Sequence, residues 1–145
     1  MSKILKSSFF ILACMIAFSC STDKREFGPG VSLEEQYVGY WKALDDISEI
    51  FYIYIKEDHT CYNNHDAAHR GKWEIVGERL EMKWDNGWNS FMEKTDDGFA
   101  KMSFMPGLAL DKVPTDNARI KKIDKKDVPQ TVLEIFKKLE EKQDR

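Results

Sequence analysis

Short runs of β-branched and aromatic residues follow one another along most of the chain, and turn residues separate them. Such runs are typical of β-strands, and the Asp, Asn, Gly and Pro residues between them favour tight connections. No connection is long enough for a crossover helix, so the sheet is expected to be antiparallel. An all-β antiparallel meander of about eight strands can close into a small barrel. The expected strands cover residues 39–44, 49–56, 60–63, 71–76, 80–84, 88–94, 99–105 and 118–123.

The hairpin around Gly77 and Glu78 separates apolar from charged side chains. A two-residue type II′ turn at these residues pairs Trp73 with Met82. One face of the hairpin then carries the apolar residues and the other face only charged ones. Because a strand exposes alternate residues to alternate faces, this register predicts one buried face.

The next hairpin, around residues 85–87, allows two registers. A two-residue turn would point Trp88 outward. A three-residue loop, with Gly87 in the left-handed conformation, pairs Trp84 with Trp88 on the inner face instead. The three-residue loop buries more large apolar side chains and is the predicted one, although it leaves Phe91 outside.

The hydrophobic period changes in residues 126–145, where apolar residues recur at three- and four-residue spacing. This pattern predicts an amphipathic helix with Asp127 as its N-cap. Residues 50–55 are apolar on both faces, so we expect the helix to pack against the outer wall of the barrel there. A helix that binds a partner protein is the alternative.

The N-terminus carries the pattern of a leader for export. Two lysines precede an apolar stretch, residues 9–18, that is too short to span a bilayer stably. Ser19 followed by Cys20 resembles the lipobox of bacterial lipoproteins. Residues 1–19 are therefore the expected leader and Cys20 the expected site of lipidation; cleavage by ordinary signal peptidase after the A-x-A-like tripeptide 17–19 is the alternative.

Residues 20–31 are polar, end in Gly-Pro-Gly and are expected to form a flexible tether, which leaves residues 32–125 for the barrel. The net charge is −3, and no long basic run is present, so nucleic-acid binding is not expected. An acidic body does not bind an anionic membrane surface by itself, so the lipid on Cys20 would hold the protein at the membrane. Ser21 after the cysteine resembles the sorting signal of enterobacterial outer-membrane lipoproteins, and this resemblance implies the outer membrane, facing the periplasm or the cell surface. Because Cys14 would be removed with the leader and Cys20 would carry the lipid, Cys61 has no expected disulfide partner.

Gly39-Tyr40-Trp41 at the start of the first strand, together with the meander and the late helix, resembles the lipocalin-like barrels. The resemblance covers roughly residues 36–142. In that family a basic residue late in the last strand packs over the tryptophan, and Arg119 or Lys121 would match it. What the resemblance implies is binding of a small apolar molecule and no catalysis.

Inward-facing apolar residues are the candidates for ligand binding. A small eight-stranded barrel is either filled by its side chains or holds one small ligand, and both remain open here. The candidates are Trp41, Phe51, Ile53, Trp73, Met82, Trp84, Trp88 and Met92.

All three histidines lie in residues 59–69. His65 and His69 would share a face if they formed a helical turn, and Cys61, Asp66 and His59 could add ligands for zinc or copper. A polar loop between two strands is the alternative and the favoured one, so no resident metal or cofactor is expected.

Motifs for nucleophilic catalysis, redox chemistry or phosphate binding are not found, so no enzyme is expected. The leading hypothesis is a lipid-anchored envelope protein whose lipocalin-like barrel binds a small apolar or amphipathic ligand. The alternatives are a protein-interaction module, such as a periplasmic inhibitor or an envelope assembly accessory, and a metal-binding protein that uses the histidine loop.

Overall fold

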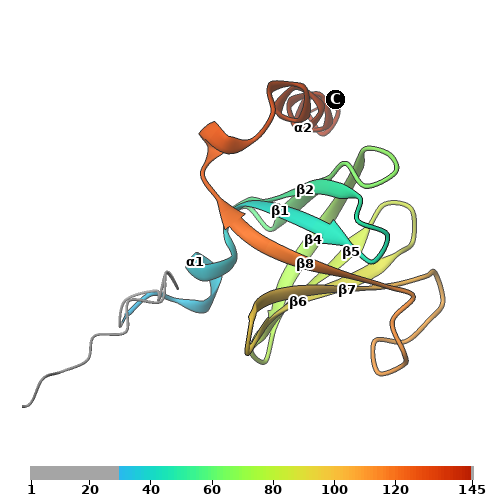
Figure 1. Cartoon of the computed structure of the whole chain (residues 1–145). Helices are drawn as coiled ribbons and strands as arrows, with labels where there is room; N and C mark the ends of the chain where they lie inside the picture. The colour runs from blue at the N-terminus through green and yellow to red at the C-terminus, as the bar shows by residue number, and fades with distance from the viewer. Residues whose placement is uncertain (1–29, 145) are drawn as a thin grey trace, which may run out of the picture.

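Each strand pairs antiparallel with its neighbour in sequence, and the last strand returns to pair with the first, which closes the barrel (Figure 1). The computed structural model describes residues 30–144. The predicted leader, Cys20 and most of the tether lie outside the described residues. The predicted all-β meander and its closure are confirmed. The strands are β1 (Gly39–Asp45), β2 (Ile50–Ile55), β3 (Thr60–Asn63), β4 (His69–Val76), β5 (Arg79–Trp84), β6 (Asn89–Thr95), β7 (Gly98–Phe104) and β8 (Asp116–Ile123).

Both predicted hairpin registers are confirmed. Trp73 pairs with Met82 across a turn in which Gly77 has a φ of 63°. In the next hairpin, the backbone N–H of Trp84 donates to the carbonyl oxygen of Trp88 at 2.9 Å, and Gly87 has a φ of 88°. Residues other than glycine rarely adopt such positive φ angles, which explains why glycine occupies both turns.

Inward-facing side chains fill the middle of the barrel. Along β1 and β2, buried residues alternate with more exposed ones, as strand geometry requires. An eight-stranded barrel is just wide enough for its own side chains to fill it, and large residues do so here. The cluster includes Trp41, Ala43, Phe51, Ile53, Ile55, Cys61, Trp73, Leu80, Met82, Trp84, Met92, Ala118 and Ile120.

Helix α1 (Leu33–Tyr37) covers the barrel end at which β1 begins (Figure 1). Its first turn is held by a capping box, in which Ser32 and Glu35 satisfy each other's backbone N–H groups. Tyr37 is buried, and its carbonyl oxygen accepts the indole N–H of Trp41 at 2.8 Å. The indole nitrogen is thereby satisfied at the closed end of the core.

Lys122 is the basic residue beside Trp41, with its Nζ 6.0 Å from the ring centroid. The same Nζ donates to the Glu35 carbonyl oxygen at 3.0 Å and so ties β8 to α1. The prediction of Arg119 or Lys121 for this position was wrong. Both residues are exposed, because alternation along β8 places them on the outer face.

Helix α2 (Gln130–Glu141) packs against the outer wall of the barrel, as predicted, and lies above β2 in Figure 1. Phe136 is buried there, and its ring centroid lies 6.2 Å from that of Tyr62. The predicted N-cap, Asp127, was wrong. It belongs to a short 3₁₀ turn that precedes the helix, and Pro129 occupies the N-cap position.

Four loops surround the barrel end opposite α1, which we call the mouth: residues 46–49, 64–68, 85–88 and 105–115. They lie together at the right of Figure 1. Within residues 30–144, no helix is both long and apolar enough to cross a membrane.

Phe91 lies on the outer face, as the three-residue loop requires, yet only 7% of it is exposed. Its ring stacks on Phe104 with centroids 5.7 Å apart, and the Arg79 guanidinium lies 4.2 Å from its centroid. Neighbouring side chains on the outer wall therefore cover Phe91. The three-residue loop consequently exposes little apolar surface at this residue.

Candidate functional site

The mouth of the barrel contains a cavity of about 220 Å³. The wall of this mouth cavity is mostly polar, and two tryptophans supply its aromatic part. Because strands β3 to β8 all end or begin at the mouth, the lining residues come from most of the barrel. They are Asn63, His65, Asp66, His69, Trp84, Asn86, Trp88, Ser90, Lys101, Ser103 and Asp116.

The eight predicted ligand-binding residues divide between the core and the mouth. Trp84 and Trp88 border the mouth cavity, Trp84 being 6% exposed and Trp88 partly buried. The remaining six pack into the core, each at most 3% exposed: Trp41, Phe51, Ile53, Trp73, Met82 and Met92. The predicted set therefore shares one interior surface, of which only the mouth end borders the cavity.

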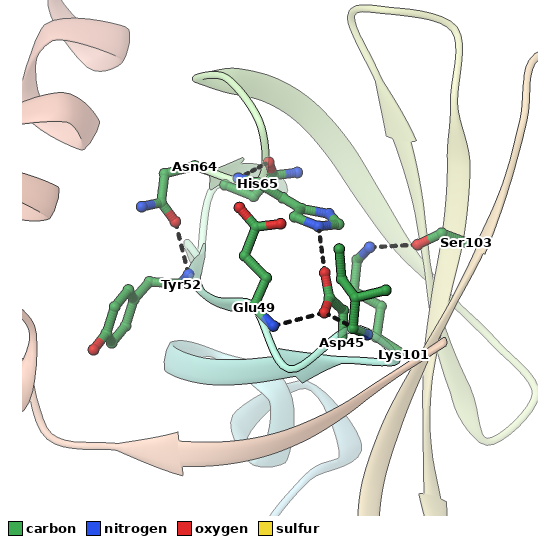
Figure 2. Close-up of polar contacts among 9 residues, drawn as sticks. Asp45, Glu49, Tyr52, Asn64, His65, Lys101 and Ser103 are labelled. Atoms are coloured by element: carbon green, nitrogen blue, oxygen red, sulfur yellow. Dashed lines mark hydrogen bonds and ion pairs between the residues drawn. The ribbon is translucent and has the colours of Figure 1, made fainter. Parts of the chain in front are cut away.

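Lys101 is the buried polar centre of the mouth cavity, with 4% of its surface exposed. Its Nζ donates to the Ser103 Oγ at 2.5 Å (Figure 2). The Ser103 Oγ lies 3.2 Å from the Ser90 Oγ, which in turn accepts the Trp84 indole N–H at 3.0 Å. One hydrogen-bonded chain thus runs from the ammonium group to the aromatic wall.

The charge of Lys101 has no close counterion in the described part of the chain, because no carboxylate oxygen there lies within 4.0 Å of its Nζ. Burial lowers the pKa of Lys101 to about 8, and Asp116, which borders the same cavity, opposes that shift. The Phe51 ring centroid lies 5.6 Å from the Nζ and provides a weak cation–π contact. At neutral pH the mouth therefore contains a buried cation.

Lys101 and the two serines were not among the predicted site residues. The sequence feature that could have indicated them is the two-residue turn at residues 96–97, because it sets the register between β6 and β7. Counting away from that turn brings Lys101 opposite Met92, which is an interior residue, and Ser103 opposite Ser90. Extending the hairpin register by one more turn would have found these residues.

Asp45 forms a second polar centre, at the mouth end of β1. One carboxylate oxygen accepts the N–H groups of Ile47 at 3.0 Å and Glu49 at 2.8 Å, and the other lies 3.0 Å from the His65 Nε2 (Figure 2). The His65 ring stacks on Phe51 with centroids 4.0 Å apart. Burial alone would raise the pKa of Asp45, but the hydrogen bonds from Glu49, His65 and Ile47 hold it below its usual value. These bonds join the first mouth loop to the second.

The histidines do not assemble into one metal site. Residues 64–68 form bends and no helical turn, His69 places its Nδ1 3.4 Å from a loop aspartate, and His59 lies at the opposite end of the barrel. Within the described residues, the group that could ligate a metal is Asp45, Glu49 and His65, with donor atoms within 4.8 Å of one another. The carboxylate of Asp45 already accepts hydrogen bonds on both oxygens, so it is committed to the loop.

Comparison of the chain with protein-family models, curated proteins and solved structures gave no match. The closed eight-stranded meander is consistent with a lipocalin-like fold. Membership of that family stays a prediction.

Proposed function

We propose that the protein is a lipid-anchored component of a bacterial cell envelope whose lipocalin-like barrel binds a small amphipathic ligand in the mouth cavity. The observation that carries the proposal is the composition of the cavity wall. A buried ammonium group and two serine hydroxyls form a hydrogen-bonded chain that ends at the indole ring of Trp84. Ligand sites typically combine an apolar surface with a few convergent polar groups in this way.

The size of the cavity limits the ligand. Sites for drug-sized molecules measure roughly 300–1,000 Å³, whereas the mouth cavity measures about 220 Å³. The core below it is occupied by packed side chains such as Trp41 and Met92. A long apolar chain would have to displace them, so we favour the amphipathic ligand over the purely apolar one.

The position of the cavity suits an anchored protein. The described chain enters at Gly30 and reaches β1 through α1, at the barrel end opposite the mouth (Figure 1). A lipid on Cys20 would therefore attach the protein by the closed end and leave the mouth accessible. If the anchor is correct, Cys20→Ala should move the protein from the membrane fraction to the soluble fraction. Retention of the variant in the membrane would contradict the anchor.

Native mass spectrometry of the full chain purified from cells tests the ligand. We expect a bound small molecule that is released on denaturation and that is lost from Trp88→Ala. Val113→Ala is the control, because Val113 is 85% exposed and does not line the cavity. Equal loss from both variants, or wild-type protein that binds nothing, would contradict the proposal.

One observation favours the protein-interaction module as a second candidate. The β1–β2 hairpin exposes three apolar side chains at the mouth, Leu44 (42%), Ile47 (81%) and Ile50 (52%). Clustered exposed apolar residues often mark contact surfaces. A photoreactive amino acid introduced at position 47 in cells should then crosslink to one dominant protein, and the absence of any protein adduct would argue against this candidate.

A further inference from the structure

We propose that the ligand of the mouth cavity is a small monocarboxylate, whose carboxylate accepts hydrogen bonds from the Lys101 ammonium and from the hydroxyl pair Ser103 and Ser90. This inference rests on the proposed function, since it presumes that the cavity is a ligand site. It adds the chemical class of the ligand and the residues that select it.

The first argument is a count of protons. The Lys101 ammonium has three N–H donors, and the described residues offer it one acceptor, the Ser103 Oγ at 2.5 Å. Each serine hydroxyl has one proton, and the two oxygens lie 3.2 Å apart, so one serine donates to the other. The Ser90 Oγ also accepts the indole N–H of Trp84. Whichever serine donates, the network keeps two ammonium protons and one hydroxyl proton to give, against one spare lone pair.

The second argument is charge. A buried cation without a close counterion is costly, and this cost falls when a ligand brings an opposite charge with hydrogen-bond acceptors. A carboxylate offers two oxygens and about four lone pairs, which match the surplus donors. Asp66 and Asp116 also border the cavity, so a doubly charged phosphate would be repelled more strongly than a singly charged carboxylate.

The third argument is the shape of the remaining space. Trp84 and Trp88 form the aromatic part of the wall and suit a flat or short apolar body. A cavity of roughly 150 Å³ accepts benzene, so about 220 Å³ leaves room for a ring with one carboxylate. Benzoate is therefore a suitable probe, and benzamide is its neutral counterpart of the same shape.

Isothermal titration calorimetry of the full chain with benzoate and benzamide tests the inference. We expect wild-type protein to bind benzoate at least about tenfold more tightly than benzamide, and Lys101→Met to lose at least about tenfold in benzoate affinity, as removal of a charged hydrogen-bond donor predicts. Lys121→Met removes an exposed charge from the outer face of β8 and should leave benzoate affinity unchanged. Ser103→Ala should weaken benzoate binding less than Lys101→Met does.

The outcomes separate this inference from the function on which it rests. If benzamide binds as tightly as benzoate, or if Lys101→Met retains wild-type benzoate affinity, the carboxylate inference is wrong while the cavity remains a ligand site. If neither probe binds and native mass spectrometry finds no ligand, the proposed function itself fails. A thermal unfolding curve for each variant shows that any loss of binding occurs in folded protein.

Discussion

The buried ammonium of Lys101 should destabilise the free protein, so Lys101→Met should stabilise it at neutral pH. In the folded protein the pKa of Lys101 is about 8, against an ordinary 10.5. At about 1.4 kcal/mol per unit of pKa, that difference corresponds to about 3 kcal/mol of unfavourable free energy when the group is charged. The lost hydrogen bond to Ser103 offsets about 1 kcal/mol of the gain.

The dependence of this stability difference on pH shows whether the charge of Lys101 causes it. Because the folded pKa of Lys101 lies below the unfolded one, the unfolded state binds the proton more readily between about pH 10.5 and pH 8. The penalty is absent above that window, grows as the pH falls through it and is complete below pH 8. The effect of Lys101→Met on stability should therefore be most favourable at pH 7, at about 2 kcal/mol, and fall by about 3 kcal/mol to a loss of about 1 kcal/mol at pH 10.5.

Urea unfolding of both proteins at several pH values between 7 and 10.5, followed by tryptophan fluorescence, measures this difference. Groups such as Tyr37, whose pKa burial raises to about 12, titrate in both proteins and drop out of the comparison. Lys121→Met, an exposed substitution, should show a flat difference from wild type over the same range. A stability difference for Lys101→Met that is equally flat would refute the reasoning.

Three further predictions concern the fold. Gly71→Ala should destabilise the protein by roughly 1–3 kcal/mol in urea unfolding, because the new Cβ would lie 2.6 Å from a carbonyl oxygen of β5 and 2.9 Å from the Trp84 ring; unchanged stability would contradict that contact. Phe136→Ala should cost about 3–5 kcal/mol by the same measurement, since it uncovers Tyr62 beneath α2; a much smaller loss would mean that the helix adds little to the barrel. Burial raises the pKa of the Cys61 thiol, so a thiol reagent such as DTNB should react with it only in denaturant, and rapid reaction of this residue in native protein would contradict its position in the core.

Strand positions and both central hairpin registers could be predicted from the sequence because they depend on local chemistry. Gly77 and Gly87 permit the backbone angles that their turns require, and the turns then fix which residues face each other. Trp84 and Trp88 were correctly placed as a cross-strand pair for the same reason. These features need no knowledge of the rest of the chain.

The face of β7 that points inward could not be read from its own residues. Ala100, Met102 and Phe104 form the more apolar face, yet Lys101 and Ser103 face the interior. The pairing of β7 with β6 decides this orientation, and it overrides the local hydrophobic pattern. Phe104 on the outer face is fully buried, and its ring stacks on that of Phe91.

Lys101 breaks the rule that a barrel interior is apolar, and such exceptions in natural proteins concentrate at functional sites. The same ammonium group accounts for the expected stability deficit and for the selection of a carboxylate, so the two effects must be coupled. Lys101→Met should gain stability at pH 7 and lose benzoate affinity together. A ligand that neutralises the charge should stabilise the wild-type protein and leave the melting temperature of Lys101→Met nearly unchanged. Gain of stability with full retention of benzoate binding would mean that Lys101 does not bind the carboxylate, and the carboxylate inference would be wrong.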